Sequence, residues 1–405
     1  MTQKVPVSLA GVSLSAALLC IVNFGSVAAE SIDNLEYVAG STNFLSAPWA
    51  DGEEMRLDLK FSNGVKIASA AYSVNSGETN GIMVWRLANR IFGVSRSLSH
   101  VEVDADTFRP LHSRWKHNLF GEADAQYTPT EAAVLLKGKD QAKKIALNGA
   151  VYDNEEAIQL MRRLPLASGY KTSLRLLSTL SAGSIVPVQV TVTGPEKISV
   201  SAGDFDCYKV ALSIHQTFWY SADAHRYLVK YDAGGAIAEL SRVAYPKPGQ
   251  PEKYQEPELG FSLAVPYDWL LSPRPGEANT NMAVVDIFDP DMAATTFLKV
   301  RKLDGLDPAF RKTVRTWAES EAAEFAKVWK NFKIRPDSWK DRMISGREGA
   351  TFVADYVDAQ SNKVVVAAFT FGAMNAAEFV MQTTPQDLDS LRPKFNTVLD
   401  GYQAK

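Results

Sequence analysis

Cys207 and His215 are residues whose types suggest nucleophilic chemistry. A cysteine activated by a histidine is a common enzyme nucleophile, and here the two lie in one stretch of alternating residues. Along a single strand their separation is about 26 Å, so they can meet only if a turn lies between them. A free cysteine is usually a small, buried, apolar residue. We therefore expect Cys207 to pack in a core.

Ser168 and Lys171 have the S-x-x-K spacing of serine acyltransferases, in which the lysine lies one helical turn from the serine and takes its proton. Pro165 and Gly169 disfavour the helix that this geometry needs. Neither an S-D-N nor a K-T-G partner string is present. An enzyme is thus only the alternative interpretation of the chain. It would be a hydrolase or transferase with a site between two domains, using Cys207 or Ser168.

Metal-binding patterns are weak. His112 and His117 are an odd number of residues apart, so on one strand they face opposite ways, whereas zinc needs three or four converging ligands. The acidic turns at residues 104–106 and 289–291 lack the glycine and distal glutamate of an EF-hand loop. Glycine-rich phosphate loops and the H-E-x-x-H and G-x-S-x-G strings are absent. We predict neither a metal nor a cofactor.

The region that must position these residues reads as a series of strands. Apolar and polar residues alternate with a period of two through Val186–Val192, and similar short runs continue to Val243. We expect Gly194 and Pro195 to end the first of these strands. Glycines in Asp232–Gly235 supply the positive φ of a tight turn. Because all the connections are short, the pairing should be antiparallel.

The same alternation begins near Arg56. An Asn-Gly pair at residues 63–64 lies between two alternating runs, which is typical of a β-hairpin. Further strands are expected as far as Leu136, and residues 81–94 fit either a strand or a helix. One helix is expected after them, with Asn154 as its cap and Pro165 beyond its end. Arg162 and Arg163 lie at its C-terminal end, where basic residues suit the helix dipole.

Three prolines in Pro246–Pro251 predict an extended linker, because proline is excluded from sheet interiors and from helix interiors. Strands and two helices are expected beyond it. The first helix should be capped by Asp307 with Pro308 at its first position, and the second closes the chain and contains Pro393. The expected core stripe of the first helix comprises Phe310, Val314, Trp317, Phe325, Val328 and Phe332.

Residues 1–29 have the pattern of a secretory signal peptide. Lys4 is the only charge, Val5–Phe24 is apolar, and Val27–Ala29 supplies the small residues of a cleavage site. Leu19 precedes Cys20, where a lipoprotein signal carries a small residue, so lipidation is disfavoured. After cleavage no other run is long and apolar enough to span a membrane. We expect a periplasmic or secreted protein that is not a lipoprotein.

The charge of the chain excludes one class of partner. The 43 basic and 46 acidic residues are mixed along the sequence and give a net charge of −3. A basic patch or stripe is the electrostatic mark of nucleic-acid binding. We therefore expect no nucleic acid as a partner.

Several short motifs are spread over residues of about 55–245. They are Thr107–Leu111, Arg163–Leu166, Gly169-Tyr170, Gly203–Val210, Trp219–Ser221 and His225–Lys230. With these motifs the stretch resembles the domain of unknown function 3108, a family of secreted or periplasmic bacterial proteins. The resemblance implies a curved antiparallel β-domain and supplies no catalytic residues.

The last part of the chain opens with Gly260–Pro266 followed by Trp269 and ends with Phe395–Tyr402. On these motifs residues 253–405 are similar to the PsbP-like fold. It implies a smaller α/β/α sandwich whose relatives act mostly as assembly or binding modules, although fold determines function only loosely. The expected organisation is a signal peptide (1–29), a curved antiparallel β-domain (30–245), a linker (246–252) and this sandwich (253–405).

Aromatic residues are the candidates for ligand binding. Rings on the concave side of a curved sheet can contact an apolar molecule or a carbohydrate. Packing in the core is the simpler role for such large side chains. The candidate ligand-binding residues are Trp115, Phe218, Trp219, Tyr220 and Tyr227.

Together these features favour a non-catalytic protein of the bacterial periplasm or exterior that works in binding or assembly. Its partner would be an apolar small molecule or another envelope protein. The fold class expected is mostly β and α+β.

Overall fold

The computed structural model describes residues 44–404 except 94–95, 119, 180–182, 275–280 and 359–360. The predicted signal peptide lies outside these residues. The chain forms two compact units, an N-terminal unit that ends at Tyr245 and a C-terminal unit that begins at Pro246. Each unit is described by itself. No helix in the described ranges is both long and apolar enough to cross a bilayer.

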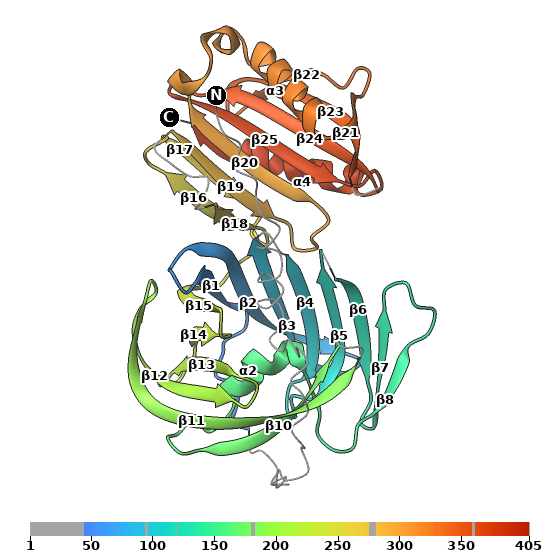
Figure 1. Cartoon of the computed structure of the whole chain (residues 1–405), viewed down its shortest axis with the longest axis vertical. Helices are drawn as coiled ribbons and strands as arrows, with labels where there is room; N and C mark the ends of the chain where they lie inside the picture. Colours follow the sequence, from blue (N-terminus) through green and yellow to red (C-terminus); the bar gives the residue numbers. More distant parts are fainter. Residues whose placement is uncertain are drawn as a thin grey trace. The chain divides into compact units, whose positions relative to one another are not determined.

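The described part of the N-terminal unit forms one 15-stranded sheet that is strongly curved (Figure 1). The chain first runs from the middle of the sheet to one edge, β1 to β8. It then returns from the other edge, β9 to β15, so that β1 and β15 pair in the middle. The strands are β1 (Glu53–Phe61), β2 (Lys66–Thr79), β3 (Ile82–Gly93), β4 (Ser97–Asp104), β5 (Pro110–His117), β6 (Gly121–Tyr127), β7 (Glu131–Leu136), β8 (Lys143–Ala146), β9 (Tyr152–Asp153), β10 (Lys171–Ser178), β11 (Ser184–Val200), β12 (Gly203–Leu212), β13 (Gln216–Ser221), β14 (Leu228–Asp232) and β15 (Ala236–Ala244).

Short connections explain the antiparallel pairing, which was expected from the sequence. At residues 63–64 the predicted Asn-Gly hairpin is present, with Gly64 at φ +83° and the amide of Phe61 donating to the carbonyl of Val65. Residues 81–94 contribute strand β3 and no helix. Only β9 and β10 pair in parallel among the described strands, because a helix lies between them in the chain.

That helix lies on the inner face of the curved sheet (Figure 1). It begins as a 3-10 turn, η3 (Asn154–Glu156), and continues as α2 (Ala157–Arg162). The prediction that Asn154 caps this helix is wrong by one residue. Asp153 is the cap: its carboxylate accepts from the amide of Glu155, and the Glu156 carboxylate accepts from the amide of Asp153. This capping box satisfies two amides that the first turn leaves unpaired.

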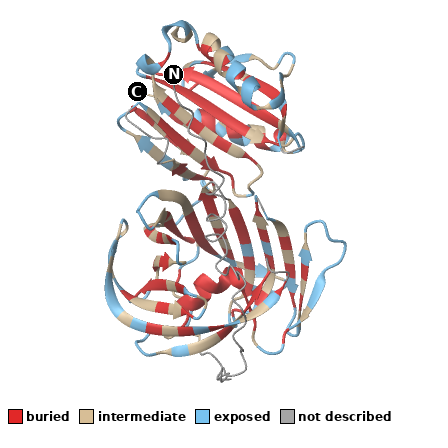
Figure 2. Ribbon diagram, in the orientation of Figure 1, coloured by how far each residue is buried: buried red, intermediate tan, exposed pale blue. Residues whose placement is uncertain are grey.

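Apolar side chains of β1 to β4 and of β9 to β15 pack with α2 in one core, and α2 is coloured as buried in Figure 2. Every second strand residue points inward, so the apolar residues that alternate in the sequence lie together in one core. Ile158, Leu160 and Met161 of α2 are fully buried in it, together with Phe218 and Tyr220 of β13. A phenylalanine buried to this extent stabilises the fold by about 1.5–3 kcal/mol.

The two edge regions of the sheet also contact one another. Val134 of β7 and Leu177 of β10 belong to one small apolar cluster, against which Ile145 of β8 and Ile185 of β11 pack. Gly183 precedes β11 with φ +75°, and a Cβ there would lie 1.9 Å from the Ile145 side chain. The positive φ favours glycine at this position, and a larger residue would displace the Ile145 side chain of β8.

Two strand boundaries differ from the sequence prediction. Gly194 and Pro195 do not end a strand, because β11 continues through them with a register shift between Thr193 and Glu196. The next strand, β12, ends at Leu212, and His215 lies in the following turn at φ +60°.

The described part of the C-terminal unit contains an 8-stranded and a 3-stranded antiparallel sheet. The larger has the order β18-β19-β20-β25-β24-β23-β21, with β22 also paired to β23, and the smaller has the order β16-β17-β26. The strands are β16 (Glu252–Glu256), β17 (Phe261–Val265), β18 (Leu270–Pro273), β19 (Met282–Phe288), β20 (Thr295–Lys302), β21 (Lys330–Ile334), β22 (Lys340–Ile344), β23 (Arg347–Asp358), β24 (Ser361–Phe371), β25 (Asn375–Thr383) and β26 (Tyr402–Ala404).

One helix covers each face of the larger sheet. Helix α3 (Val314–Val328) packs on alternate residues of β23 to β25, such as Phe352 and Val380, and α4 (Leu388–Asp400) packs on the residues between them. Two short 3-10 turns, η4 (Leu303–Gly305) and η5 (Pro308–Arg311), precede α3. The whole described chain is thus mostly β, with large antiparallel sheets and few helices.

The predicted long helix is two elements. Asp307 caps only the turn η5, and Thr313 caps α3 by accepting from the amide of Thr316. The predicted core stripe therefore fails at its C-terminal end: Val328 is 79% exposed and Phe332 belongs to β21. Pro393 lies inside α4 without breaking it.

Candidate functional site

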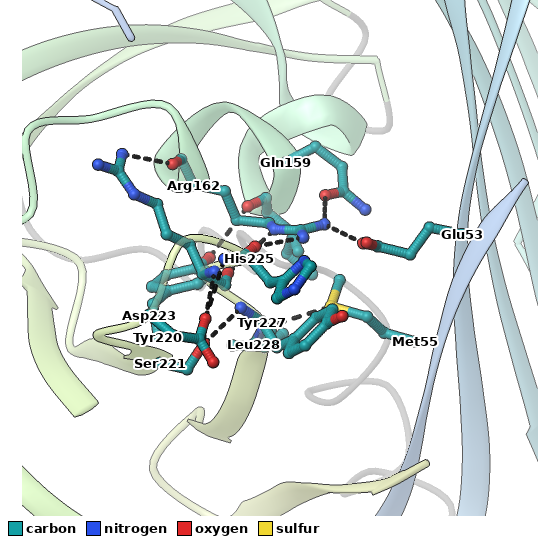
Figure 3. Close-up of polar contacts among 12 residues, drawn as sticks. Glu53, Met55, Gln159, Arg162, Tyr220, Ser221, Asp223, His225, Tyr227 and Leu228 are labelled. Atoms are coloured by element: carbon teal, nitrogen blue, oxygen red, sulfur yellow. Dashed lines mark hydrogen bonds and ion pairs between the residues drawn. The ribbon is translucent and has the colours of Figure 1, made fainter. Parts of the chain in front are cut away.

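A fully buried arginine lies at the centre of the N-terminal unit, where the sequence suggested only a basic helix end. Arg162, in the last turn of α2, has no exposed surface. Figure 3 shows its guanidinium between the helix and β1. Nη1 lies 2.8 Å from the Glu53 carboxylate and also donates to Oε1 of Gln159 at 2.8 Å. The ion pair offsets part of the cost of burying the two charges.

The same guanidinium joins α2 to the loop between β13 and β14. Its Nε donates to the carbonyl of Arg226 at 3.0 Å, and Nη2 donates to the carbonyl of His225 at 2.7 Å. Arg226 reciprocates, since its Nη1 donates to the carbonyls of Arg162 and Leu164 at 3.0 and 2.8 Å. We call Glu53, Gln159, Arg162 and Arg226 the arginine clasp.

The loop itself is shaped to present those carbonyls. Arg226 adopts φ +51°, a conformation that is rare for a non-glycine residue. The Asp223 carboxylate holds it by accepting from the amides of His225 and Arg226 and from the hydroxyl of Ser221. The Tyr227 ring lies 5.8 Å from the Arg162 guanidinium (Figure 3). Each nitrogen of Arg162 is in contact with an acceptor from the surrounding elements, so the clasp fastens α2 to β1 and to the β13–β14 loop.

A second buried polar group lies at the start of the same helix. Asp153, Glu155 and Glu156 are all buried, and no lysine or arginine in the described ranges forms an ion pair with any of them. Burial is the main cause that raises the pKa of all three carboxyls, to about 7 for Glu155. The hydroxyl of Tyr127 donates to Asp153 at 2.5 Å. We call the three acids the carboxyl cluster.

The carboxyl cluster is bonded to protein groups. Each carboxyl contacts mainly the backbone and neutral side chains, such as Asn154 to Glu155. Among the residues that the structure describes, no three His, Cys, Asp or Glu side chains are arranged to hold a metal ion. Burial without a cation favours the neutral form of a carboxyl.

The candidate nucleophiles do not come together with a base. Cys207 is fully buried on the outer side of β12, against Trp219 and Val229. Burial, with nearby acidic residues, raises the pKa of its thiol to about 12. Cys207 pairs with Ser221 at one end of β13, whereas His215 lies in the turn at the other end. The intervening turn thus does not bring His215 to the thiol.

Ser168 and Lys171 also lack the geometry of a serine acyltransferase. Ser168 is exposed in a turn, and Lys171 is the first residue of β10. The helical turn that would place a lysine beside the serine is not formed by these residues. This agrees with the effect expected of Pro165 and Gly169.

The five candidate ligand-binding aromatics do not line one surface. Phe218 and Tyr220 point into the core, where the Tyr220 hydroxyl donates to the carbonyl of Ile158. Trp219 points to the opposite face of β13, between the ammonium groups of Lys209 and Lys230 at 5.6 and 5.3 Å.

The other two aromatics lie elsewhere in the unit. Trp115 is buried on β5 and stacks on His117, and Tyr227 packs beside the arginine clasp. Ligand binding by these residues stays a prediction. A ligand in contact with all five would need a different arrangement of the sheet.

Two hollows on the N-terminal unit were not anticipated from the sequence. The first, of about 470 Å³, lies over β2 to β5, and its charged side chains pair with one another or with neighbours: Arg86 with Glu102, and His112 with Asp124. The second, of about 450 Å³, lies at the β7–β8 hairpin. Both depend on which residues face each other across strands. Such cross-strand pairs become visible only once the register is known.

The N-terminal unit contains the region that matches a protein family. Residues 56–239 match the family described as "Protein of unknown function (DUF3108)". No curated protein matches the sequence. The family thus covers most of the curved sheet, including α2 and the loop of the arginine clasp, and it carries no assigned activity.

Several solved structures are similar to parts of the chain. Cyanobacterial PsbP from Synechocystis sp. PCC 6803 is 14% identical over 38% of this chain and 93% of its own, with a TM-score of 0.31. LpqN of Mycobacterium tuberculosis, involved in cell envelope biogenesis, is 18% identical over 38% and 90%, with a TM-score of 0.29. MucB is 8% identical over 89% and 94%, with a TM-score of 0.21. The PsbP-like assignment of residues 253–405 stays a prediction.

Proposed function

We propose that the protein is a non-catalytic binding protein that is exported from the cytoplasm and holds a small molecule or an envelope partner on its N-terminal unit. The observation that carries this proposal is that the buried charged and acidic side chains of the N-terminal unit make structural contacts. Arg162 and the carboxyl cluster form hydrogen bonds and an ion pair that hold α2 inside the sheet. Export is inferred from the signal-peptide pattern of residues 1–29.

The packing of the sheet favours a ligand that binds on the surface of the unit. Helix α2 and the side chains around it occupy the inner face of the sheet. A molecule that entered there would have to displace residues that are fully buried. The hollows over β2 to β5 and at the β7–β8 hairpin are open to a ligand without that cost.

The thiol of Cys207 is expected to be unreactive in the folded protein. A rise of the pKa from 9.0 to about 12 lowers the thiolate fraction at neutral pH roughly 10³-fold. The test is the rate of reaction with a chromogenic disulfide reagent, in a chain carrying Cys20→Ser so that Cys207 is the sole thiol. The unfolded chain in urea is the control and should react at once. A folded protein that reacts as fast as the unfolded one would favour the alternative enzyme interpretation.

The direct test of the proposed function is native mass spectrometry of the full protein purified from its own periplasm. The expected result is a mass above that of the chain, released on denaturation. Release of a lipid, a sugar or a polypeptide would identify the class of partner. A chain that carries nothing under these conditions and that turns over substrate analogues of hydrolases would overturn the proposal.

A further inference from the structure

The hollow at the β7–β8 hairpin combines an apolar floor with a cationic rim. Val134 and Leu136 of β7 form the floor, and Lys139, Asp140 and Lys143 lie around it with Gln141. Its volume of about 450 Å³ falls within the range of roughly 300–1,000 Å³ that is usual for small-molecule sites. An apolar floor with charge at its edge suits a molecule that has both kinds of surface.

The strand register decides which lysines face this hollow. Lys143 lies opposite Val134, and residues opposite each other in an antiparallel pair share a face. Lys144 lies opposite Ala133 and therefore points to the other face, where it pairs with Glu131 at 3.1 Å. The hairpin thus sorts adjacent lysines to opposite sides.

The lysines on the two faces differ in their partners. On the outer face Lys137 pairs with Glu122 at 2.9 Å, as Lys144 does with Glu131. Neither Lys139 nor Lys143 forms an ion pair with a carboxylate in the ranges that the structure describes. The ammonium groups beside the apolar floor are therefore available for an anion, whereas those on the outer face are already neutralised.

The floor of the hollow continues into a packed cluster. Val134 and Leu136 belong to the group that joins β7 to β10 and β11, and Ile145 packs against the same group. Gly183 lies close to the Ile145 and Val134 side chains. An alkyl chain that enters along Val134 and Leu136 would therefore meet an existing apolar surface.

We propose that this hollow binds an anionic amphiphile with a single acyl chain, its chain against Val134 and Leu136 and its acidic group at Lys139 and Lys143. The assignment rests on the proposed binding function and names its ligand class. Asp140 on the rim offsets one of the two ammonium charges, which favours a head group with one negative charge. The hollow over β2 to β5 fits such a ligand less well, because Arg86 is already paired with Glu102.

The test uses the full-length mature protein and calorimetric titration with three probes below their micellar concentrations. Oleate presents a carboxylate, lysophosphatidylglycerol presents a phosphodiester, and lysophosphatidylcholine has the same chain with no net charge. We expect the two anionic probes to bind at least about tenfold more tightly than the zwitterionic one, a difference that salt should reduce. The stronger of the two anionic probes distinguishes a free fatty acid from a phospholipid as the source.

Matched variants locate the site. Lys139→Gln with Lys143→Gln should lower the affinity for the anionic probes at least about tenfold, whereas Lys137→Gln with Lys144→Gln removes the same charge from the outer face and should change it less than about twofold. Leu136→Gln should weaken all three probes. These lysines are exposed, so the variants are expected to fold.

Three results would overturn the assignment. They are no binding of either anionic probe, equal losses in both double variants, and equal affinity for the neutral and anionic lipids. The proposed binding function fails separately, through the mass measurement on protein from the periplasm. A different molecule that is released there, with no effect of Lys139→Gln and Lys143→Gln on its retention, would leave the function standing and place the ligand elsewhere.

Discussion

Replacing Arg162 with methionine is expected to lower the free energy of unfolding of the N-terminal unit by about 3–5 kcal/mol. The substitution leaves Glu53 as a buried charge without its partner and removes the donors to the carbonyls of His225 and Arg226. Methionine keeps most of the volume of the arginine side chain, so the loss of stability reflects the missing polar contacts. Urea unfolding followed by tryptophan fluorescence measures it as a shift of the transition midpoint at constant slope.

The matched control is Lys144→Met on β8, in the same unit. Lys144 pairs with Glu131 where both side chains are exposed, and such pairs contribute only about 0.2–1 kcal/mol. Adding Glu53→Gln to Arg162→Met should recover part of the loss, because the buried charge is then gone. A loss below about 1 kcal/mol in Arg162→Met, equal to that of the control, would contradict the role assigned to the arginine clasp.

The stability of the N-terminal unit is expected to fall as the pH rises through 7, and Glu155→Gln should remove a large part of this fall. Burial raises the pKa of Glu155 from 4.5 to about 7 in the folded chain. A raised pKa means that the folded state holds the proton more tightly. The stabilisation is therefore complete below pH 4.5 and is lost as the pH rises to 7 and above. The size is about 3 kcal/mol, at 1.36 kcal/mol for each pKa unit.

The measurement compares unfolding of the wild type and of Glu155→Gln at pH 4.5 and pH 8. Asp153 and Glu156 also have raised pKa values, so the wild type alone does not isolate Glu155, and the difference between the two proteins does. Glutamine keeps an oxygen acceptor for Asn154. Asp204→Asn, at an exposed carboxylate of the same unit, is the control and should leave the pH profile unchanged. A variant whose stability follows the wild type at both pH values would show that Glu155 is ionised in the fold.

The parts of the fold that the sequence predicted correctly are those set by local rules. Alternation with a period of two depends only on whether a strand has one buried face, and it located the meander around Val190 and Val210. The Asn-Gly hairpin at residues 63–64 depends only on the backbone freedom of its glycine. Both predictions are confirmed because strands that are neighbours in these parts of the chain are also neighbours in the sheet.

The errors arise where tertiary contacts override local preference. Pro195 was expected to end a strand, yet β11 continues because β12 pairs on both sides of the irregularity. Asp307 and Pro308 carry the pattern of a helix start, and they start only a short turn, because Thr313 provides the cap of α3. A pattern identifies a cap without saying how far the helix behind it runs.

The candidate sites were the least predictable part. Arg162 looked like a basic residue suited to a helix C-terminus, and its burial follows only from Glu53 and the His225 loop, which are distant in the sequence. The β7–β8 hollow likewise requires the register that separates Lys143 from Lys144. No local pattern contains either fact.

The pairing of β1 with β15 has a consequence for how the N-terminal unit folds. Glu54 lies beside Ala244 in the middle of the sheet, so the central ladder joins the start of the unit to its end. Contacts this distant in sequence form slowly, because the chain must close a long loop first. Until the last strand is in place, β1 keeps an unpaired edge that is open to aggregation.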